Sequence, residues 1–318
     1  MDVLVLTNCT SRKRSPKTGS GAARWSPGHR SKYESVQDLA RHWERTIEQA
    51  EARQFAVDLY AGRAATDARE ASTLAGAKLA FVSAGLGLLQ ANVMVPHYDL
   101  TVAAGNSSIS PALAQVRATP ADWWLTLNKG PSIARLISAP STKLMLLALP
   151  SGYLEMVSSD LGQCADVFAK KLRIFTSGKG RQAVPDHLRG CVMPYDERLE
   201  ATPFAGTRAD FPQRALRHFI QELKGHRLAL ASGRTAVEDA LSDREIPIRP
   251  PRTKLPDGEI LALLRKRWSD YGGRSTRLLR FLRDDALVAC EQGRFRQLWQ
   301  QLRAEAAFLR GEKDGSKT

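Results

Sequence analysis

The chain has 318 residues, of which 43% are hydrophobic and 25% are charged, and its formal net charge is +14. This composition excludes a disordered or fibrous chain, and the length allows one large domain or two of ordinary size. The surplus of Lys and Arg favours a polyanionic partner, because each neutralised phosphate releases counterions. A solubilising surface in an arginine-rich proteome is the alternative.

Cysteine usage and hydropathy narrow the class of protein further. The four cysteines, Cys9, Cys164, Cys191 and Cys290, form no C-x-x-C pair, so neither a zinc site nor a disulfide framework is indicated. The first ten residues carry an acid where a secretory signal carries bases, and no apolar stretch approaches the ~20 residues that span a bilayer. We therefore expect a cytoplasmic protein that uses no metal or cofactor.

The first two thirds of the chain alternate between strand and helix patterns. Short apolar runs predict buried strands at 3–7, 79–83, 143–149 and 172–175. Helical spacing predicts helices at 35–53, before Gly76, at 111–138 in two pieces, and from after Tyr153 to about 171, whereas 15–32 and 94–102 are expected as loops. This alternation is typical of an α/β fold with a three-layer, mainly parallel sheet.

The last third changes in composition. A helix is expected at 205–224, and the proline-rich residues 246–256 are interpreted as a linker between an α/β domain, 1–245, and a basic helical module, 257–318. In the module, helices are expected at 257–270, from Ser275, and at 292–309. Arg277, Arg280 and Arg283 recur every third residue and so share one helix face. This outline fits a helix-turn-helix or winged-helix DNA-binding module, and a helical cap with solvated arginines fits equally well.

Polar segments follow the predicted strands, and in a parallel sheet such strand ends converge on one edge. The first turn contains Asn8, Cys9, Ser11 and Lys13, flanked by Arg12 and Arg14. The later segments contribute Asp58 and Tyr60, Ser83 and Gly85, Tyr98 and Asp99, Ser151 and Tyr153, and Lys179 and Arg181. Each segment alone also fits an ordinary turn or helix cap, and their convergence is what favours a composite cleft.

The residue types suggest roles in that cleft. The amide of Asn8 suits orienting a water or reading a base edge, and Ser11 and Lys13 suit binding a phosphate. Asp99 beside Tyr98 suits base stacking with activation of water. The basic glycine loop at 177–181 lacks a full phosphate-binding loop, so ATP use is not expected.

The segments VLVLTNCTSRK, DLYAGRAATDAREASTLAGAKLAFVSAGLGLL and VPHYDLT, in this order, resemble a bacterial and phage family of uncharacterised proteins. That family is related to the peroxide-stress DNA-binding proteins and to a domain of archaeal tRNA-guanine transglycosylases, with a uracil-DNA-glycosylase-like core. The resemblance covers about residues 1–105, and departs from the family pattern at Gly85. The organisation of the whole chain resembles anti-phage DNA glycosylases, one of which removes glucosylated hydroxymethylcytosine from phage DNA.

The resemblance implies a DNA glycosylase that acts on a modified base in double-stranded phage DNA. Asn8 would position water, Asp99 or Asp58 would be the catalytic carboxylate, and Tyr98 or Tyr60 would stack on the extruded base. Phosphates would be held by Lys13, Ser151 and Arg181, and duplex affinity would come from Arg277, Arg280 and Arg283. A DNA-binding regulator or sensor without turnover, and a base-exchanging transglycosylase, are the alternatives.

Overall fold

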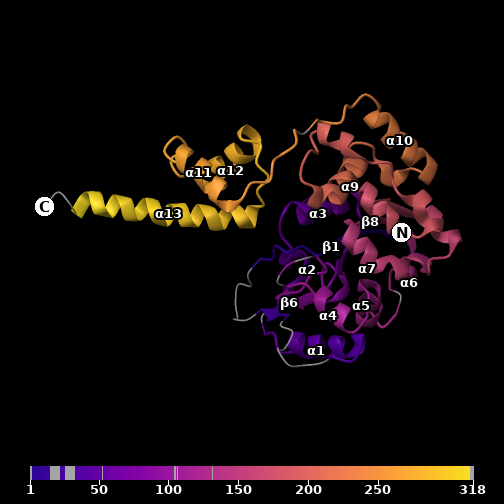
Figure 1. Cartoon of the computed structure of the whole chain (residues 1–318). Helices are drawn as coiled ribbons and strands as arrows, with labels where there is room; N and C mark the ends of the chain where they lie inside the picture. Colours follow the sequence, from indigo (N-terminus) through magenta and orange to yellow (C-terminus); the bar gives the residue numbers. More distant parts are fainter. Residues whose placement is uncertain are drawn as a thin grey trace. The chain divides into compact units, whose positions relative to one another are not determined.

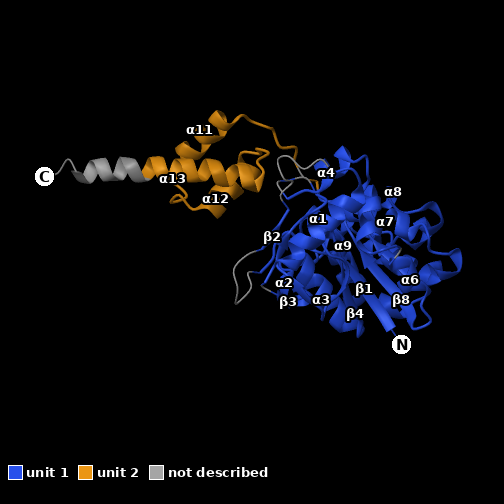
Figure 2. Ribbon diagram, turned by 90° about the horizontal axis from the view of Figure 1, so that it is seen from below, with its two compact units in different colours: residues 1–247 blue, residues 248–318 orange. Residues whose placement is uncertain are grey.

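The computed structural model describes residues 2–14, 22–25, 33–51, 53–103, 105, 107–130, 132–248 and 250–315, with side chains as far as residue 306. The chain divides into two compact units, 1–247 and 248–318 (Figure 2). The division falls at the start of the proline-rich segment that the sequence suggested as a linker. Within the described residues, no helix is long and apolar enough to cross a membrane.

Unit 1 is built on a five-stranded sheet in the order β5-β4-β1-β8-β9 (Figure 1). The strands are β1 (Asp2–Asn8), β4 (Lys78–Ser83), β5 (Gly87–Gln90), β8 (Thr142–Ala148) and β9 (Leu172–Phe175). β1 is parallel to β4 and β8, β8 is parallel to β9, and β5 alone runs antiparallel. The predicted α/β class and mainly parallel sheet are therefore confirmed, and the four predicted strands lie where the sequence places them.

The sheet is covered on both faces, which explains why its strands are continuous apolar runs. Alternate residues of β8 enter separate cores: Leu144 and Leu146 pack on one face, and Met145 and Leu147 on the other. The first face is covered by α3 (Arg63–Ala75) and α9 (Phe211–Gln221). The second face is covered by helices that contribute to the other core: α1 (Val36–Glu48), α5 (Pro120–Leu127), α6 (Ile133–Ser138) and α7 (Ser151–Leu161). The result is a three-layer arrangement.

Helix boundaries follow local capping chemistry. Ser35 caps α1 by accepting from the Asp38 amide, and Thr119 forms a capping box with Asp122 at α5. Gly76 ends α3 in the left-handed conformation, with φ 59° and ψ 34°, as the sequence predicted. α1 ends five residues before the predicted limit, at Glu48.

Several predicted elements are wrong. Residues 111–138 form three helices, the first being α4 (Ser110–Gln115), and the helix expected to reach 171 ends at Leu161, followed by a 3-10 turn. The expected loop at 94–102 contains β6 (Met94–Pro96) and β7 (Tyr98–Asp99), which pair with β3 (Arg53–Phe55) and β2 (Ala23–Arg24). Most of the loop expected at 15–32 lies outside the described residues. The remaining α-helices in the described part of unit 1 are α2 (Ala56–Leu59), α8 (Gly178–Gln182) and α10 (Leu230–Ser242), and the sequence did not predict α10.

Unit 2 contains α11 (Asp257–Arg267), α12 (Ser275–Arg280), a π-helical turn (Phe281–Asp285) and α13 (Gln292–Gly315). Its own apolar core includes Ile260, Leu264, Leu278, Leu282 and Leu298, each at most 5% exposed. Two ion pairs, Arg265 with Glu305 and Arg294 with Asp257, join α11 to α13. The three helices expected from the sequence are present, and unit 2 is a helical module with a separate core.

Candidate functional site

The candidate site lies at the end of β1. There the chain turns and pairs with the end of α2 and the residues that follow it. The Cys9 amide donates to the Val82 carbonyl at 2.9 Å, so the ladder extends one residue beyond β1. The Ala61 amide donates to the Arg12 carbonyl at 3.0 Å, and Lys13 forms an antiparallel bridge with Tyr60. These backbone bonds fix the turn that carries Ser11 and Lys13.

The turn forms one wall of a cavity of ≈ 140 Å³. The cavity is lined by Cys9, Thr10, Ser11, Lys13, Asp99, Leu100, Thr101, Gly105, Ser107 and Tyr153. Its walls include the segments after β1 and β8, which are neighbouring strands in the sheet. The chain continues from β1 to β4 on one side of this pair and from β8 to β9 on the other side. Ligands of open α/β sheets bind at such a switch point, beyond the carboxyl ends of the strands.

Five of the sequence-predicted residues therefore line one cavity: Cys9, Ser11, Lys13, Asp99 and Tyr153. Sequence reasoning missed the residues that complete the lining, notably Thr101 and Ser107. Thr101 lies two residues after Asp99 and was within reach of the same argument. Ser107 had no signal, because it reaches the cavity through a loop whose course depends on tertiary contacts: its hydroxyl donates to Asp99 Oδ2 at 2.6 Å.

Three other predicted residues lie beneath the cavity as a buried hydrogen-bonded group. The Tyr98 hydroxyl lies 2.8 Å from the Tyr60 hydroxyl and 2.6 Å from Ser83 Oγ, which also accepts from the amides of Gly85 and Leu86. Both tyrosines are fully buried, and burial raises the pKa of each phenol. They are therefore placed to support the cavity floor, not to stack on a ligand within it.

Gly85 is required by the packing of this floor. A Cβ at this position would lie 2.7 Å from Tyr98 Cε2 and 3.2 Å from Trp43 Cζ2. The Gly85 carbonyl in turn accepts from the Trp43 indole at 2.5 Å. Two aromatic rings, Tyr98 and Trp43, therefore fill the space that a side chain at position 85 would take.

A second wall is formed by Tyr153 in the first turn of α7. Its hydroxyl lies 3.0 Å from Cys9 Sγ and 3.3 Å from the Cys9 carbonyl, to which it can donate. Burial and the neighbouring Cys9 raise the pKa of the Tyr153 phenol. Ser151, the first residue of α7, is half-buried and does not line the cavity.

Lys13 and Asp99 give the cavity its charge. Lys13 Nζ lies 4.4 Å from the centre of the Tyr98 ring. Burial lowers the pKa of the Lys13 amine, and the charges of Cys9 and Asp99 oppose this effect. The adjoining His97 also has a lowered pKa, first because of burial and then because of Lys13.

Asn8 lies next to the cavity but its side chain is occupied elsewhere. It is 8% exposed, its amide donates to the Cys9 carbonyl at 2.7 Å, and its Oδ1 accepts from Gln213 Nε2 at 2.8 Å. Gln213, on α9, also donates to Thr7 Oγ1 and to the Ala148 carbonyl. Asn8 therefore ties β1 to α9, and the cavity lining does not include it. No sequence signal links residues 8 and 213.

The other predicted residues lie outside the cavity. Asp58 is exposed on α2, and Arg12 and Arg14 are exposed on the turn after β1. Lys179 and Arg181 are exposed on α8, which corrects the expected glycine loop. Here Ser177 caps a short helix by accepting from the Gly180 amide, and a Cβ on Gly180 would meet Thr176.

The three regularly spaced arginines of unit 2 differ in exposure. Arg277 and Arg280 are exposed on α12. Arg283 is half-buried in the π-helical turn, and its guanidinium donates to the Cys290 carbonyl at 3.0 Å. Arg283 therefore stabilises the module and has fewer donors left for a partner.

Neither metal chemistry nor known relatives define the site. Among the described residues, no cluster of three or more His, Cys, Asp or Glu side chains is arranged to hold a metal ion. Comparison with known proteins gives no match to a family model, to a curated protein or to a solved structure.

Proposed function

We propose that the chain is a DNA glycosylase that hydrolyses the N-glycosidic bond of a modified base and leaves an abasic site, as a defence against phage DNA. The observation that carries this proposal is the cavity at the switch point of the sheet, with the charged residues Lys13 and Asp99 in its lining. A volume of ≈ 140 Å³ is below the roughly 300 Å³ at which sites for drug-sized ligands begin, so the cavity suits one ring of the substrate, the base or a sugar, and a glucosylated base would extend beyond it.

Chemistry of this kind needs a carboxylate beside the sugar. Base loss develops positive charge on the deoxyribose, which a carboxylate stabilises while it orients or deprotonates the attacking water. Asp99 lines the cavity and is positioned by the Ser107 hydroxyl, whereas Asp58 does not line it. The proposal therefore assigns the carboxylate to Asp99. It assigns no water contact to Asn8, whose amide is held by Gln213.

Duplex binding is assigned to exposed basic side chains. Arg12 and Arg14 flank the cavity-forming turn, Lys179 and Arg181 lie on α8, and Arg277 and Arg280 lie on α12. A glycosylase extrudes its target nucleotide from a duplex, and phosphate contacts position the duplex without reading its sequence. A uracil-DNA-glycosylase-like core and a helix-turn-helix module belong to this same proposal.

Mass spectrometry of released bases tests the proposal. Wild-type protein is incubated with unmodified DNA and with phage DNA carrying glucosylated hydroxymethylcytosine, and free base is measured together with abasic sites. We expect release from modified DNA only, and a loss of roughly 100-fold or more in Asp99→Asn, because general-base catalysis contributes about 10²–10⁴. Asp166→Asn, an exposed carboxylate on a 3-10 turn, is the matched control.

The second candidate is a DNA-binding sensor without turnover. It is favoured by one observation, the engagement of the Asn8 amide within the protein. A sensor predicts salt-dependent DNA binding with no free base from any DNA, and binding that is unchanged in Asp99→Asn.

A further inference from the structure

Lys13 is an amine held in place inside the cavity. Its backbone is fixed on both sides, since the Arg14 amide donates to the Leu59 carbonyl at 2.9 Å and the Arg12 carbonyl accepts from Ala61. Its side chain is half-buried, lines the cavity and ends over the Tyr98 ring. The observed orientation places the amine over Tyr98, within a side chain that lines the cavity.

Lys13 has no ion-pair partner in the described part of the chain. Among those residues, no carboxylate oxygen lies within 4.0 Å of Nζ, although Asp99 lines the same cavity. A lysine that serves structure is ordinarily paired or extends into water. Burial also lowers the pKa of this amine, which increases the neutral fraction. An amine in the cavity lining that lacks an ion-pair partner is free to react with a carbonyl group of a ligand.

We propose that Lys13 is a nucleophile that forms an imine with the C1′ aldehyde of an abasic deoxyribose, and that the site then cleaves the DNA strand. This inference rests on the proposed function only in taking the DNA sugar as the ligand of the cavity. It goes beyond that function by adding a second reaction, β-elimination, at the same site.

The reaction balances without a co-reactant. The neutral amine adds to the open-chain aldehyde, and the adduct takes up one proton from solvent and loses one water, which gives a protonated imine between Lys13 Nζ and C1′. Hydrolysis at the end of the cycle returns that proton. Removal of a C2′ proton then expels the 3′ phosphate, so the C3′–O bond breaks and a C2′–C3′ double bond forms. Water hydrolyses the conjugated imine, which releases an unsaturated aldehyde end and restores the Lys13 amine.

Asp99 is the group in the lining that can take the C2′ proton. Its Oδ2 accepts from the Ser107 hydroxyl at 2.6 Å, which orients the carboxylate. Imine formation does not need this base, whereas elimination does. Loss of the carboxylate should therefore slow strand cleavage and leave imine formation intact.

Borohydride trapping tests the inference. DNA with a preformed abasic site is made by removing uracil with a separate enzyme and then purifying the DNA. The full chain is mixed with this DNA and sodium borohydride, which reduces the imine to a stable amine, and the cross-linked complex is measured on a denaturing gel. We expect efficient trapping by wild type and by Asp99→Asn, with strand cleavage slowed in Asp99→Asn.

Two measurements assign the trapped amine. Lys13→Arg keeps the positive charge over Tyr98 and should lower trapping by roughly tenfold or more, because a guanidinium does not form the imine. The matched control is Lys143→Arg, an exposed lysine on β8, which should match wild type. Mass spectrometry of the wild-type cross-link should place the sugar fragment on Lys13, and this readout needs no variant to fold.

The results separate this inference from the proposed function. Trapping that maps to Lys13 supports it, whether or not the protein releases a base from phage DNA. Base release by wild type with no cross-link on preformed abasic sites would leave a glycosylase that uses water alone, and the inference would be overturned. Equal trapping by Lys13→Arg, or a cross-link spread over surface lysines, would also overturn it.

Discussion

The residues that line the cavity show which side chains can be assigned to a site from the sequence alone. Cys9, Ser11, Lys13 and Tyr153 follow strands with apolar central residues, and parallel strand ends converge whatever the details of the loops. Their roles depend on contacts that the sequence does not encode locally. The turn pattern suggested that Asn8 was available for water, whereas Gln213, 205 residues away, holds its amide.

His218 gives a prediction for the pH dependence of stability. It is 6% exposed, its Nδ1 lies 2.8 Å from the Tyr195 hydroxyl, and burial lowers its pKa below the usual value of 6.5. As pH falls through about 6.5, the unfolded chain binds a proton that the folded protein does not yet bind. The free energy of unfolding should therefore decrease from about pH 6.5 toward the lowered folded pKa, with this contribution complete above 6.5.

Urea denaturation between pH 5 and 8 checks this expectation. One group contributes a slope of at most about 1.4 kcal/mol per pH unit within that window. His218→Gln should reduce the slope below pH 6.5, even though it lowers stability at every pH by removing packing against Tyr195 and Phe204. A slope identical to that of the wild type would show that His218 does not carry this dependence.

At the scale of elements, the strands and helices that the sequence predicts correctly are those whose apolar residues are buried whatever their neighbours. β1, β4, β8 and β9 are buried on both faces, and α3 ends at a glycine that tolerates positive φ. The elements that were missed are short and depend on partners distant in sequence. β7 exists because it pairs with β2, and α8 because Ser177 supplies a cap where the glycines predicted a loop.

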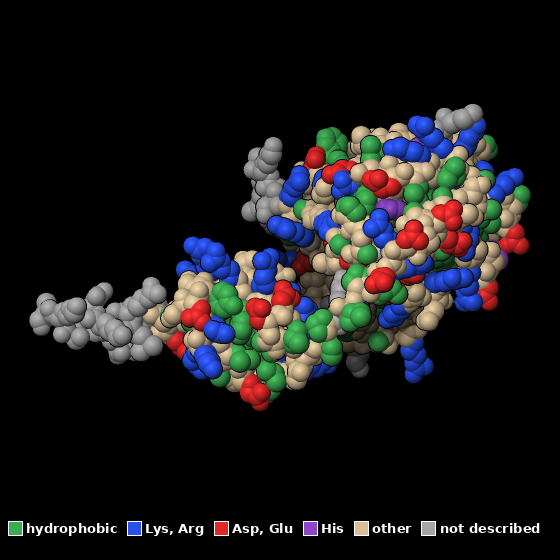
Figure 3. Space-filling model, turned by 90° about the horizontal axis from the view of Figure 1, so that it is seen from above, with side chains coloured by type: hydrophobic (Ala, Val, Ile, Leu, Met, Phe, Trp, Pro, Cys, Tyr) green, Lys and Arg blue, Asp and Glu red, His purple; other side chains and the backbone are tan. Residues whose placement is uncertain are grey.

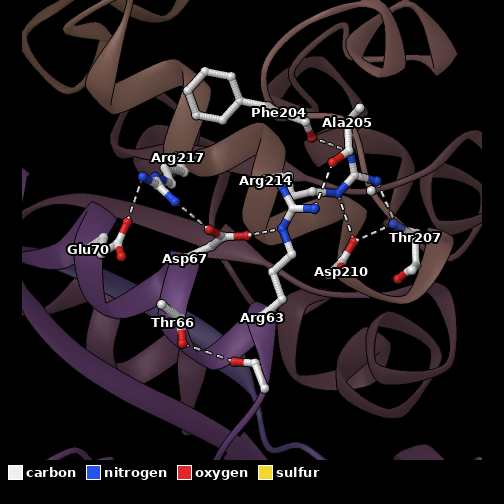
Figure 4. Close-up of polar contacts among 12 residues, drawn as sticks. Arg63, Thr66, Asp67, Glu70, Phe204, Ala205, Thr207, Asp210, Arg214 and Arg217 are labelled. Carbon is white, nitrogen blue, oxygen red and sulfur yellow. Dashed lines mark hydrogen bonds and ion pairs between the residues drawn. The ribbon is translucent and has the colours of Figure 1, made fainter. Parts of the chain in front are cut away.

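Arg214 on α9 holds the preceding segment, residues 200–210, against that helix (Figure 4). The guanidinium is fully buried and donates to Asp210 at 2.7 Å, to Glu200 at 2.7 Å, and to the carbonyls of Phe204 and Thr207. A Cβ at Gly206 would lie 2.6 Å from Arg214 Nε, so the backbone there closes against the guanidinium. A planar group with donors on both edges is what satisfies four acceptors at once.

Arg214→Lys should therefore destabilise unit 1 strongly. The ammonium cannot reach all four acceptors, and a buried ion pair that loses a partner costs about 3–5 kcal/mol. Arg208→Lys, in the adjacent 3-10 turn, is the matched control because this side chain is exposed, and its effect should stay within about 0.5 kcal/mol. Chemical denaturation followed by tryptophan fluorescence measures both, and equal effects would refute the assigned role of Arg214.

At the scale of the whole molecule, the chain consists of two compact units and carries a net positive charge. On the face in Figure 3, Lys and Arg side chains are spread over both units, with Asp and Glu among them. A charge of +14 predicts a polyanionic partner from the sequence alone, because charge acts at long range and needs no fold. Which arginines would contact such a partner depends on which guanidinium groups are free, and the bond from Arg283 to the Cys290 carbonyl shows that regular spacing does not decide this.

The salt dependence of DNA binding tests the role of α12. Each phosphate neutralised contributes about 0.9 to the slope of log affinity against log salt concentration, so removing two contacts should lower the slope by about 2. Arg277→Gln combined with Arg280→Gln removes two exposed charges from α12. Arg296→Gln combined with Arg303→Gln removes two from α13, so the net charge changes equally. We expect the α12 pair alone to reduce the slope in fluorescence anisotropy titrations at several salt concentrations. The same reduction in both pairs would mean that binding follows net charge and not a surface on α12, because only a localised phosphate contact distinguishes variants of equal charge.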